Sequence, residues 1–340
     1  MRGIKLSSPR LLLIGVLFVT ATGLTIGAVT SSATYGPYNY DWDGTGDLRD
    51  LAHETGAEIE TVGVTTEYQT ADSDQAVALV IEPSESYSGS TAQEIDTFLE
   101  RGGDVVIASS RARSANQLLA DIGVESRFDG RPLRDARRYY RSPALPVAEP
   151  VDETISSDIA SQVILNHGTV VTPSGDSTVL LESSQSSYLD LNTNQTLDEN
   201  ESLREYPVVV REDIGNGSVM IVGDSSVFVN GMLEQNGNSN FAQNLMIGSD
   251  TVLIDIPAKE AIPSVAVFIP TTVEPWQVIV LFTALLSIIL LFTIVRSYTE
   301  TASRTESHDA EPPESIAETL AEKHPEWGED RIERVIDSLE

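Results

Sequence analysis

The stretch TAQEIDTFLERGGDVVIAS, residues 91–109, places a helical pattern directly before a strand pattern. Residues 91–103 are a candidate helix that ends at two glycines, as helices commonly do. The following segment, residues 104–109, is rich in small and β-branched residues and is typical of a strand. A helix that leads straight into a strand is one half of a βαβ unit, so this stretch indicates an α/β fold.

The same alternation of helices and strands continues on both sides of this stretch. Towards the N-terminus we expect a helix from Asp47 to Gly56, a strand ending at Val64 and a strand at 76–82. Towards the C-terminus we expect helical segments at 114–123 and 225–247, and strands at 177–183, 206–212, 218–224 and 251–256. An irregular stretch with prolines, residues 127–175, separates the two parts. We therefore predict one α/β domain with an insertion, built on a mostly parallel sheet that helices cover.

The composition excludes several classes of function. Of the 340 residues, 52 are acidic and 21 are basic, which gives a formal net charge of -31. Such a surface is typical of a halophilic protein and argues against nucleic acid as a partner. The chain has no cysteine, so disulfides, thiolate metal sites and cysteine nucleophiles are excluded.

Two uncharged apolar runs, residues 11–29 and 276–295, predict two transmembrane helices. Basic residues lie next to their outer ends, at Arg10 and Arg296, so the positive-inside rule places both termini in the cytoplasm. The first run is alternatively a cleaved signal peptide, because Ser31 begins a group of small residues. Either reading makes the intervening domain extracellular.

This interpretation gives four regions along the chain. They are an N-terminal transmembrane anchor at 1–30, an extracellular α/β domain at 31–275, a second span at 276–295 and a cytoplasmic acidic tail at 296–340. The tail contains two short segments with apolar residues at helical spacing, 315–323 and 329–340. A helix pair of this size is too small to be stable alone, so it either docks on a partner or has no specific role.

A candidate calcium loop lies in SYLDLNTNQTLDENESL, residues 187–203. Oxygen-bearing residues occupy positions 1, 3, 5, 7, 9 and 12 of a twelve-residue window, the spacing of an EF-hand loop: Asp190, Asn192, Asn194, Thr196, Asp198 and Glu201. Position 6 is Gln195 where such loops need glycine, and strands flank the loop in place of helices.

Two other interpretations of this loop are open. One is a polar turn in an acidic protein, since Asp and Asn favour turns. The other is glycosylation, because Asn194, Asn200 and Asn216 each begin an acceptor sequon. A glycan on Asn194 would remove one calcium ligand, so the two occupancies exclude each other.

A serine nucleophile is the candidate for catalysis. Ser225 follows a strand in VGDSSVF, and His167 in LNHG is a candidate base. No acid partner or oxyanion donor is evident, and Asp224 with Ser225 is equally suited to cap the next helix. We therefore expect no enzyme activity, with a serine-type hydrolase as the alternative.

Six arginines fall within fifteen residues, interleaved with aromatic side chains: Arg127, Arg131, Arg134, Arg137, Arg138 and Arg141. Guanidinium groups pair with carboxylates and stack on aromatic rings. We expect this cluster to bridge acidic faces within the domain, with docking of an acidic partner or an anionic lipid headgroup as the alternative.

An ordered set of motifs resembles a known family. LVIEPSESYS, GGDVVIAS, RSPALPV, LNHGTVV and SVMIVGDSSVFVNGML follow one another between the two apolar runs. Their order is similar to that of haloarchaeal membrane proteins with the domain of unknown function numbered 4350, over residues 35–295. The resemblance implies a flavodoxin-like or class I amidotransferase-like α/β domain without established activity. Amidotransferase chemistry itself is excluded because the turn after residues 104–109 has no cysteine.

The expected function follows from these points together. We expect a membrane-anchored extracellular module that binds partners without catalysis and is stabilised by one calcium ion. The resemblance implies other membrane or cell-envelope proteins as partners, including a MoxR-type ATPase module.

Overall fold

The computed structural model describes residues 32–62, 66–83, 89–152, 159–255 and 313–338, together with residues 15, 283, 284 and 287. The chain divides into two compact units, residues 1–278 and 279–340. The second unit contains α10 (Pro313–Lys323) and α11 (Glu329–Asp337), in agreement with the two short helices expected in the tail. The elements described below belong to the first unit.

A nine-stranded sheet with the order β1-β13-β2-β3-β12-β11-β9-β6-β7 forms the centre of the first unit. Its parallel half consists of β1 (Glu58–Val62), β13 (Thr251–Asp255), β2 (Ala76–Ile81), β3 (Asp104–Ala108) and β12 (Gly217–Val222). Its antiparallel half consists of β11 (Pro207–Ile214), β9 (Thr178–Glu182), β6 (Val147–Pro150) and β7 (Val163–Ile164). Every neighbouring pair is parallel from β1 to β12 and antiparallel from β12 to β7.

The prediction of a mostly parallel, flavodoxin-like or amidotransferase-like sheet between two spans is therefore wrong. The sheet changes direction at β11 and β12, which only Gly215 and Asn216 separate. Gly215 has φ 62°, the left-handed backbone that two-residue hairpins need. A connection this short joins antiparallel strands, whereas a parallel pair needs a crossover of about a dozen residues or more.

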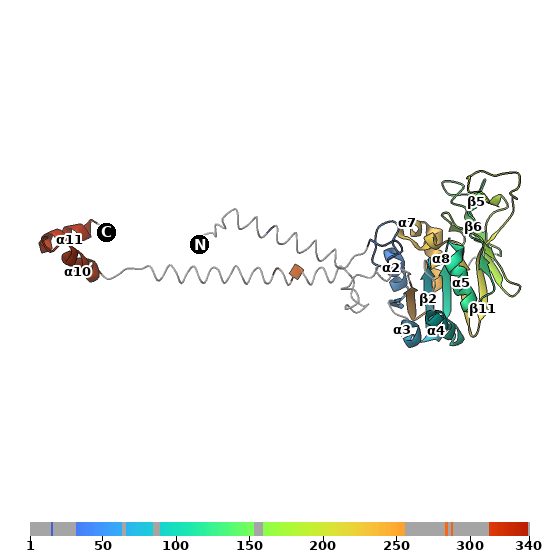
Figure 1. Ribbon diagram of the computed structural model, residues 1–340, viewed down its shortest axis with the longest axis horizontal. Coiled ribbons are helices and arrows are strands. Elements are labelled where there is room, and N and C mark those ends of the chain that lie inside the picture. The colour runs from blue at the N-terminus through green and yellow to red at the C-terminus, as the bar shows by residue number, and fades with distance from the viewer. Residues whose placement is uncertain are drawn as a thin grey trace. The chain divides into compact units, whose positions relative to one another are not determined.

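Helices cover both faces of the parallel half (Figure 1). One face packs against α2 (Gly46–Glu54), α7 (Asn230–Leu233) and α8 (Asn236–Met246). The other packs against α3 (Thr66–Thr70), α4 (Gly89–Glu100) and α5 (Ala112–Asp121). β2 shows why two cores result, because Val77 and Leu79 face the first layer while Ala78 and Val80 face the second. Helices thus cover both faces of this half of the sheet, although the sheet as a whole is mixed and not mostly parallel.

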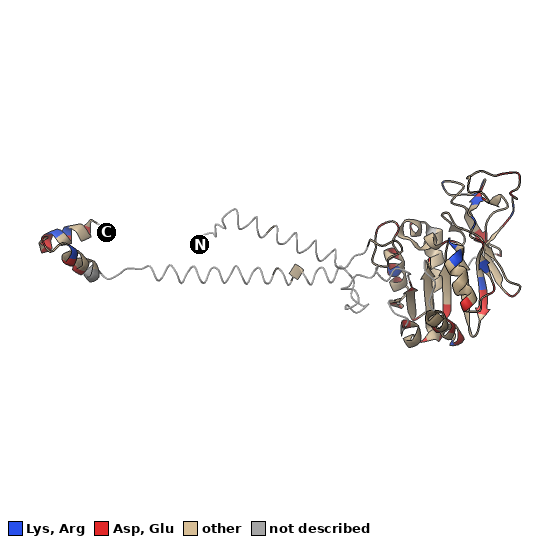
Figure 2. Ribbon diagram, in the orientation of Figure 1, with Lys and Arg blue, Asp and Glu red and all other residues tan. Residues whose placement is uncertain are grey.

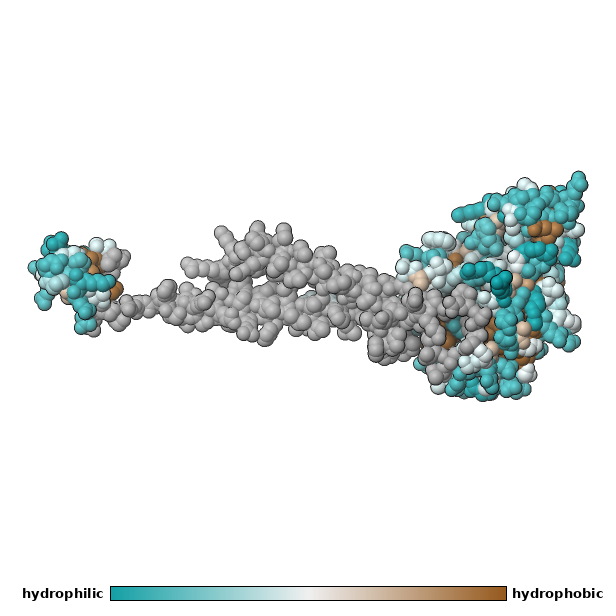
Figure 3. All heavy atoms as spheres, in the orientation of Figure 1, coloured by the Kyte–Doolittle hydropathy of each residue, from teal (hydrophilic) through white to brown (hydrophobic). Residues whose placement is uncertain are grey.

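Charged residues are rare in the strands of the parallel half and common on the surface of the first unit. The strands of the parallel half are drawn mainly tan in Figure 2, as expected for strands that are buried on both faces. The visible face of the first unit is mainly hydrophilic, with hydrophobic atoms in small separate groups (Figure 3). This surface agrees with the large acidic excess of the sequence.

The stretch 127–175, expected to be irregular, contains short strands. Besides β6 and β7 these are β4, β5 and β8, which take part in two small antiparallel pairs. β4 (Arg127–Phe128) pairs with β8 (Val171–Thr172), and β5 (Leu133–Asp135) pairs with β10 (Ser187–Leu189). Two 3₁₀ turns, η1 (Ser73–Gln75) and η2 (Ser225–Phe228), complete the unit.

The prediction of a two-span membrane protein is corrected as well. Within the described ranges, no helix combines the length and the apolar character needed to cross a membrane. Apart from a few isolated positions, the apolar runs at 11–29 and 276–295 lie outside the described residues. The membrane location, the extracellular position of residues 31–275 and the cytoplasmic tail depended on these spans and are not supported.

Candidate functional site

The carboxyl ends of β2, β3 and β12 meet at one edge of the sheet, since these strands are parallel neighbours. In open α/β sheets this edge is the usual position of a ligand site. Glu82 follows β2, Ser109 follows β3, and Asp224 and Ser225 follow β12. The structure therefore brings the candidate serine beside a carboxylate that the sequence analysis did not single out.

Glu82 is 2% exposed, and its carboxylate accepts hydrogen bonds from several neighbours. Oε1 accepts from Ser109 Oγ at 3.1 Å and from Arg111 Nε at 2.8 Å. Oε2 accepts from the backbone N–H of Ser110 at 3.0 Å and from Ser225 Oγ. Its backbone has φ 48°, an uncommon value for a residue other than glycine. Glu82 thus joins the ends of three strands through hydrogen bonds that use both of its oxygens.

Asp224 forms a second buried network at the same edge. Its side chain accepts from the backbone N–H of Ser226 at 2.8 Å, from the backbone N–H of Asn166 and from Ser110 Oγ at 3.3 Å. Complete burial raises the pKa of this carboxyl to about 6, even though these hydrogen bonds act in the opposite direction. Asp224 caps η2, as the non-catalytic interpretation expected.

The proposed nucleophile and the proposed base lie in neighbouring segments but have different hydrogen-bond partners. Ser225 is fully buried, donates its hydroxyl hydrogen to Glu82 and lies 3.0 Å from the hydroxyl oxygen of Tyr35. The exposed ring of His167 has Nδ1 2.8 Å from Asn166 Oδ1. Within the described part of the chain, no hydrogen bond joins the His167 ring to Ser225. The two residues do not form the base–nucleophile pair that serine hydrolysis needs.

The 190–201 loop is held by its own side chains and by Arg134. Asp190 is buried, pairs with Arg134 Nε at 2.7 Å and accepts from the backbone N–H groups of Asn194 and Gln195 at 3.0 and 2.9 Å. Glu201 accepts from the N–H of Leu191 at 2.8 Å and so ties the two ends of the loop together.

Two of the remaining candidate ligands, Asn192 and Asn194, converge on one carboxylate oxygen of Asp198. The side-chain amides of Asn192 and Asn194 donate to Asp198 Oδ2 at 2.7 and 2.8 Å. The side chain of Thr196 donates to Asn194 Oδ1 at 2.8 Å. These contacts bring the expected ligand residues of the loop close together. A polar turn without a metal ion would show the same contacts.

The backbone of Gln195 has φ 68°, the left-handed conformation needed at position 6 of a calcium loop. Against this, no group of three or more His, Cys, Asp or Glu side chains that could hold a metal ion occurs among the described residues. The candidate ligands also include asparagine and threonine oxygens, which do not belong to these four residue types. Calcium binding by the loop therefore stays a prediction. The sequon at Asn194 also stays a prediction.

Most of the arginine cluster is engaged within the unit. Arg131 pairs with Asp129, Arg134 with Asp190 and Arg138 with Glu149, while Arg127 donates to backbone oxygens and Arg141 lies over the Tyr140 ring. This agrees with the internal bridging expected of the cluster. The guanidinium of Arg137 has no hydrogen bond or ion pair among the described residues, and this side chain lines a pocket.

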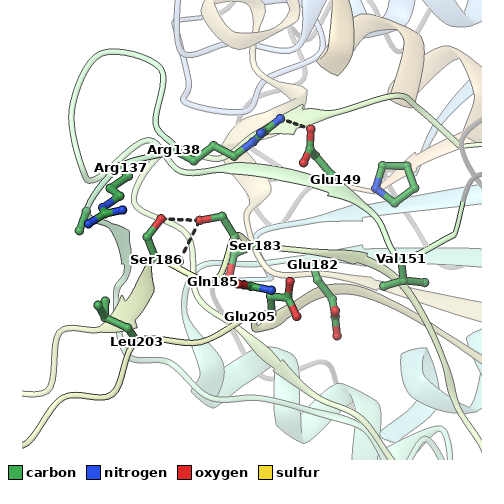
Figure 4. Close-up of a pocket in the computed structure, with 13 residues that line it drawn as sticks. Arg137, Arg138, Glu149, Val151, Glu182, Ser183, Gln185, Ser186, Leu203 and Glu205 are labelled. Carbon is green, nitrogen blue, oxygen red and sulfur yellow. Dashed lines mark hydrogen bonds and ion pairs between the residues drawn. The ribbon is translucent and has the colours of Figure 1, made fainter.

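This pocket has a volume of about 760 Å³ and lies at the antiparallel half (Figure 4). Four segments that are distant in sequence form it: 136–138, 149–151, 182–186 and the pair Leu203 and Glu205. Pockets of roughly 300–1,000 Å³ are typical of ligand sites. Sequence reasoning missed the pocket, because no local pattern links these segments.

Asp135 holds two walls of the pocket together. Its carboxylate accepts from the backbone N–H groups of Arg137 and Arg138 at 2.8 and 2.7 Å. It also accepts from the hydroxyls of Ser184, Ser186 and Ser187. Burial acts to raise the pKa of Asp135, but these hydrogen bonds outweigh it and hold the pKa below its usual range. The pocket is therefore fixed by a buried carboxylate that is itself fully engaged.

Three glutamates meet in this pocket. Glu149 on β6 lies directly opposite Glu182 on β9, and Glu205 precedes β11. Arg138 pairs with Glu149, whereas within the described residues the carboxylates of Glu182 and Glu205 have no hydrogen bond or ion pair. Burial and the nearby charge of Glu205 raise the pKa of Glu182. These two carboxylates therefore have no ion-pair partner among the described residues, although Arg137 and Arg138 line the same pocket.

Comparisons with known proteins support a family but no activity. The mmIFT52 N-terminal domain is 13% identical, with a TM-score of 0.41, over 54% of this chain and 81% of that chain. Cytoplasmic Protein STM3548 from Salmonella typhimurium is 12% identical, with a TM-score of 0.37, over 61% of this chain and 85% of that chain. Likenesses of this size carry no functional argument, and no curated protein matches the sequence. The family model described as Domain of unknown function (DUF4350) matches residues 37–246, more than half of the chain, so the protein belongs to this family.

Proposed function

We propose that this protein is a non-catalytic binding module that holds a segment of a partner protein in the pocket of its antiparallel half. The observation that carries the proposal is the pair Glu182 and Glu205, two charged groups without partners among the described residues in a pocket of about 760 Å³. Glu182 is half-buried, and burial together with the charge of the exposed Glu205 disfavours its ionised form, so a bound cationic group would stabilise both carboxylates.

The carboxyl edge of the parallel half supports the same conclusion by contrast. The carboxylates of Glu82 and Asp224 are bonded to neighbouring residues, and the Ser225 hydroxyl is buried among them. A nucleophile needs access to its substrate, and the side chain of Ser225 is fully buried. The serine-hydrolase alternative therefore has less support than binding.

The identity of the partner remains a prediction. The resemblance implies a MoxR-type ATPase module or another cell-envelope protein. The net charge of -31 supports the haloarchaeal origin that the resemblance also implies, and it favours a partner with a basic surface.

A site-directed crosslink tests the proposal. Because the chain has no cysteine, Gln185→Cys places a single thiol in the pocket for a photoreactive benzophenone label. Irradiation in extract of the source cells is expected to give one defined product. The protein in that product, once purified, is expected to bind the unlabelled full chain.

The matched control is Gln93→Cys, an exposed glutamine on α4. It is expected to give none of that product. The same products from both positions, or a captured protein that does not bind after purification, would contradict the proposal.

A further inference from the structure

We infer that the pocket receives a lysine or arginine side chain of the partner protein, with its cationic end between Glu182 and Glu205. This inference rests on the proposed function and adds the chemistry of the group that is recognised. It follows from the arrangement of charge, apolar surface and hydrogen-bonding groups in the pocket (Figure 4).

The charges of the pocket favour a cation near Glu182 and Glu205. Glu149 and Glu182 are directly opposed on neighbouring strands, an arrangement that like charges disfavour. Arg138 neutralises Glu149, which leaves Glu182 and Glu205 to repel each other. A bound ammonium or guanidinium group would remove this repulsion and pair with both carboxylates.

Two apolar side chains that line the same pocket favour a long basic side chain. Val151 and Leu203 line the pocket and are 44% and 49% exposed. Lysine and arginine carry several methylene groups below their charge and bury these groups against apolar surface. A cation without an alkyl stem would leave Val151 and Leu203 uncovered.

The remaining polar groups suit a peptide. Gln185 is an exposed amide that lines the pocket, and it can bond to a peptide backbone. The guanidinium of Arg137, which forms no ion pair among the described residues, disfavours a second positive charge beside it. The pocket therefore suits one basic residue better than a run of them.

Binding of synthetic peptides to the purified full chain tests the inference. The probes are fluorescein-labelled ten-residue Gly-Ser peptides with one central lysine, arginine, acetyl-lysine or glutamate, measured by fluorescence anisotropy. We expect the lysine and arginine peptides to bind at least about tenfold more tightly than the acetyl-lysine and glutamate peptides, because only they carry the charge. The combined Glu182→Gln and Glu205→Gln variant is expected to lose this preference.

Two variants separate specific recognition from the general acidic field. Glu54→Gln with Glu100→Gln removes two exposed charges elsewhere in the unit and is expected to leave the affinity within about twofold. Arg137→Gln is expected to bind the lysine peptide at least as tightly as the wild type, since it removes a like charge from the pocket.

Several outcomes would overturn the inference. They are equal binding of the lysine and acetyl-lysine peptides, unchanged binding by the Glu182→Gln and Glu205→Gln variant, and tighter binding of free spermidine than of the lysine peptide. The crosslink distinguishes failure of this inference from failure of the proposed function. If the Gln185→Cys crosslink forms equally well when both glutamates are replaced, the pocket binds a partner, and only the recognition of a basic residue is refuted.

Discussion

The two halves of the sheet differ in whether the carboxylates near their strand ends have partners. At the carboxyl edge of the parallel half, Glu82 and Asp224 are buried and bonded to neighbouring strand ends. In the antiparallel half, Glu182 and Glu205 face a pocket without a partner among the described residues. Both halves contain carboxylates near strand ends, so the chemistry of the residues is the same and only its use differs.

This difference shows that position in an α/β sheet does not determine a binding site. A carboxyl edge can bind ligands only if its polar groups are left available. Here hydrogen bonds between neighbouring loops use these groups to hold the edge together. The carboxylates without partners among the described residues, Glu182 and Glu205, lie in the antiparallel half, which the β11–β12 hairpin joins to the parallel half.

The largest expected effect is loss of stability on replacing Glu82 with alanine. The substitution leaves the donors of Ser109, Ser110 and Ser225 without their acceptor, so the free energy of unfolding is expected to fall by about 4 kcal/mol. Urea denaturation measures the change. Glu54→Gln, an exposed control, is expected to change it by less than about 0.5 kcal/mol. A loss below about 1 kcal/mol would mean that the edge does not depend on Glu82.

The next effect concerns the pH dependence of stability at Asp224. Its pKa of about 6 in the folded state lies above the ordinary value of 3.8. The folded state therefore binds this proton more tightly than the unfolded state, and the stability it contributes is present below pH 3.8 and lost as the pH rises through 6. The full difference is about 3 kcal/mol.

Urea denaturation of the wild type and of Asp224→Asn at several pH values tests this prediction. The free energy of unfolding of the wild type relative to the variant is expected to increase as the pH falls from about 7 to about 4. The comparison is needed because Asp135 and Glu212 have lowered pKa values and act with the opposite sign. A constant difference between the two proteins would show that Asp224 does not titrate in this range.

Calcium is expected to have an intermediate effect on the 190–201 loop. At a concentration 100 times the dissociation constant, a bound ion would raise the free energy of unfolding by about 2.7 kcal/mol. Melting temperatures in calcium and in chelator measure this stabilisation. Asp198→Asn is expected to reduce it, whereas Glu199→Gln, the neighbouring acidic residue outside the ligand positions, is expected to retain it. The same melting temperature in both solutions would leave the loop as a polar turn.

The smallest expected effect is a gain of stability on replacing Glu205 with glutamine. This change removes the charge that acts on Glu182, so stability is expected to rise by about 0.5 kcal/mol while peptide binding weakens. A double-mutant cycle with Glu182→Gln tests the coupling, since Glu205→Gln should give no gain in that background. Equal gains in both backgrounds would show that the two carboxylates do not interact.

Local patterns in the sequence predicted many individual elements. The strands expected at 76–82, 104–109, 206–212 and 218–224 correspond to β2, β3, β11 and β12. The direction of β11 was missed although its signal was local, because Gly215 and Asn216 leave room only for a hairpin. Strand directions thus depend on the connections between strands as much as on the strands themselves.

The pocket could not be predicted in the same way. Glu149 and Glu182 become neighbours only through the register of β6 against β9, and nothing near either residue specifies that register. Pairing of this kind depends on long-range packing, which a single sequence does not reveal. The cap at Asp224 was predictable because a cap depends on adjacent residues alone.

The position of β13 between β1 and β2 has a consequence for the order of folding. β1 ends at Val62 and its neighbour in the sheet begins at Thr251, so nearly 190 residues separate their synthesis. Until β13 arrives, β1 has no partner strand and β2 has an open edge. Because such distant contacts form slowly, the nascent chain is expected to expose these two strand edges for most of its synthesis and to close its sheet as one of the last steps.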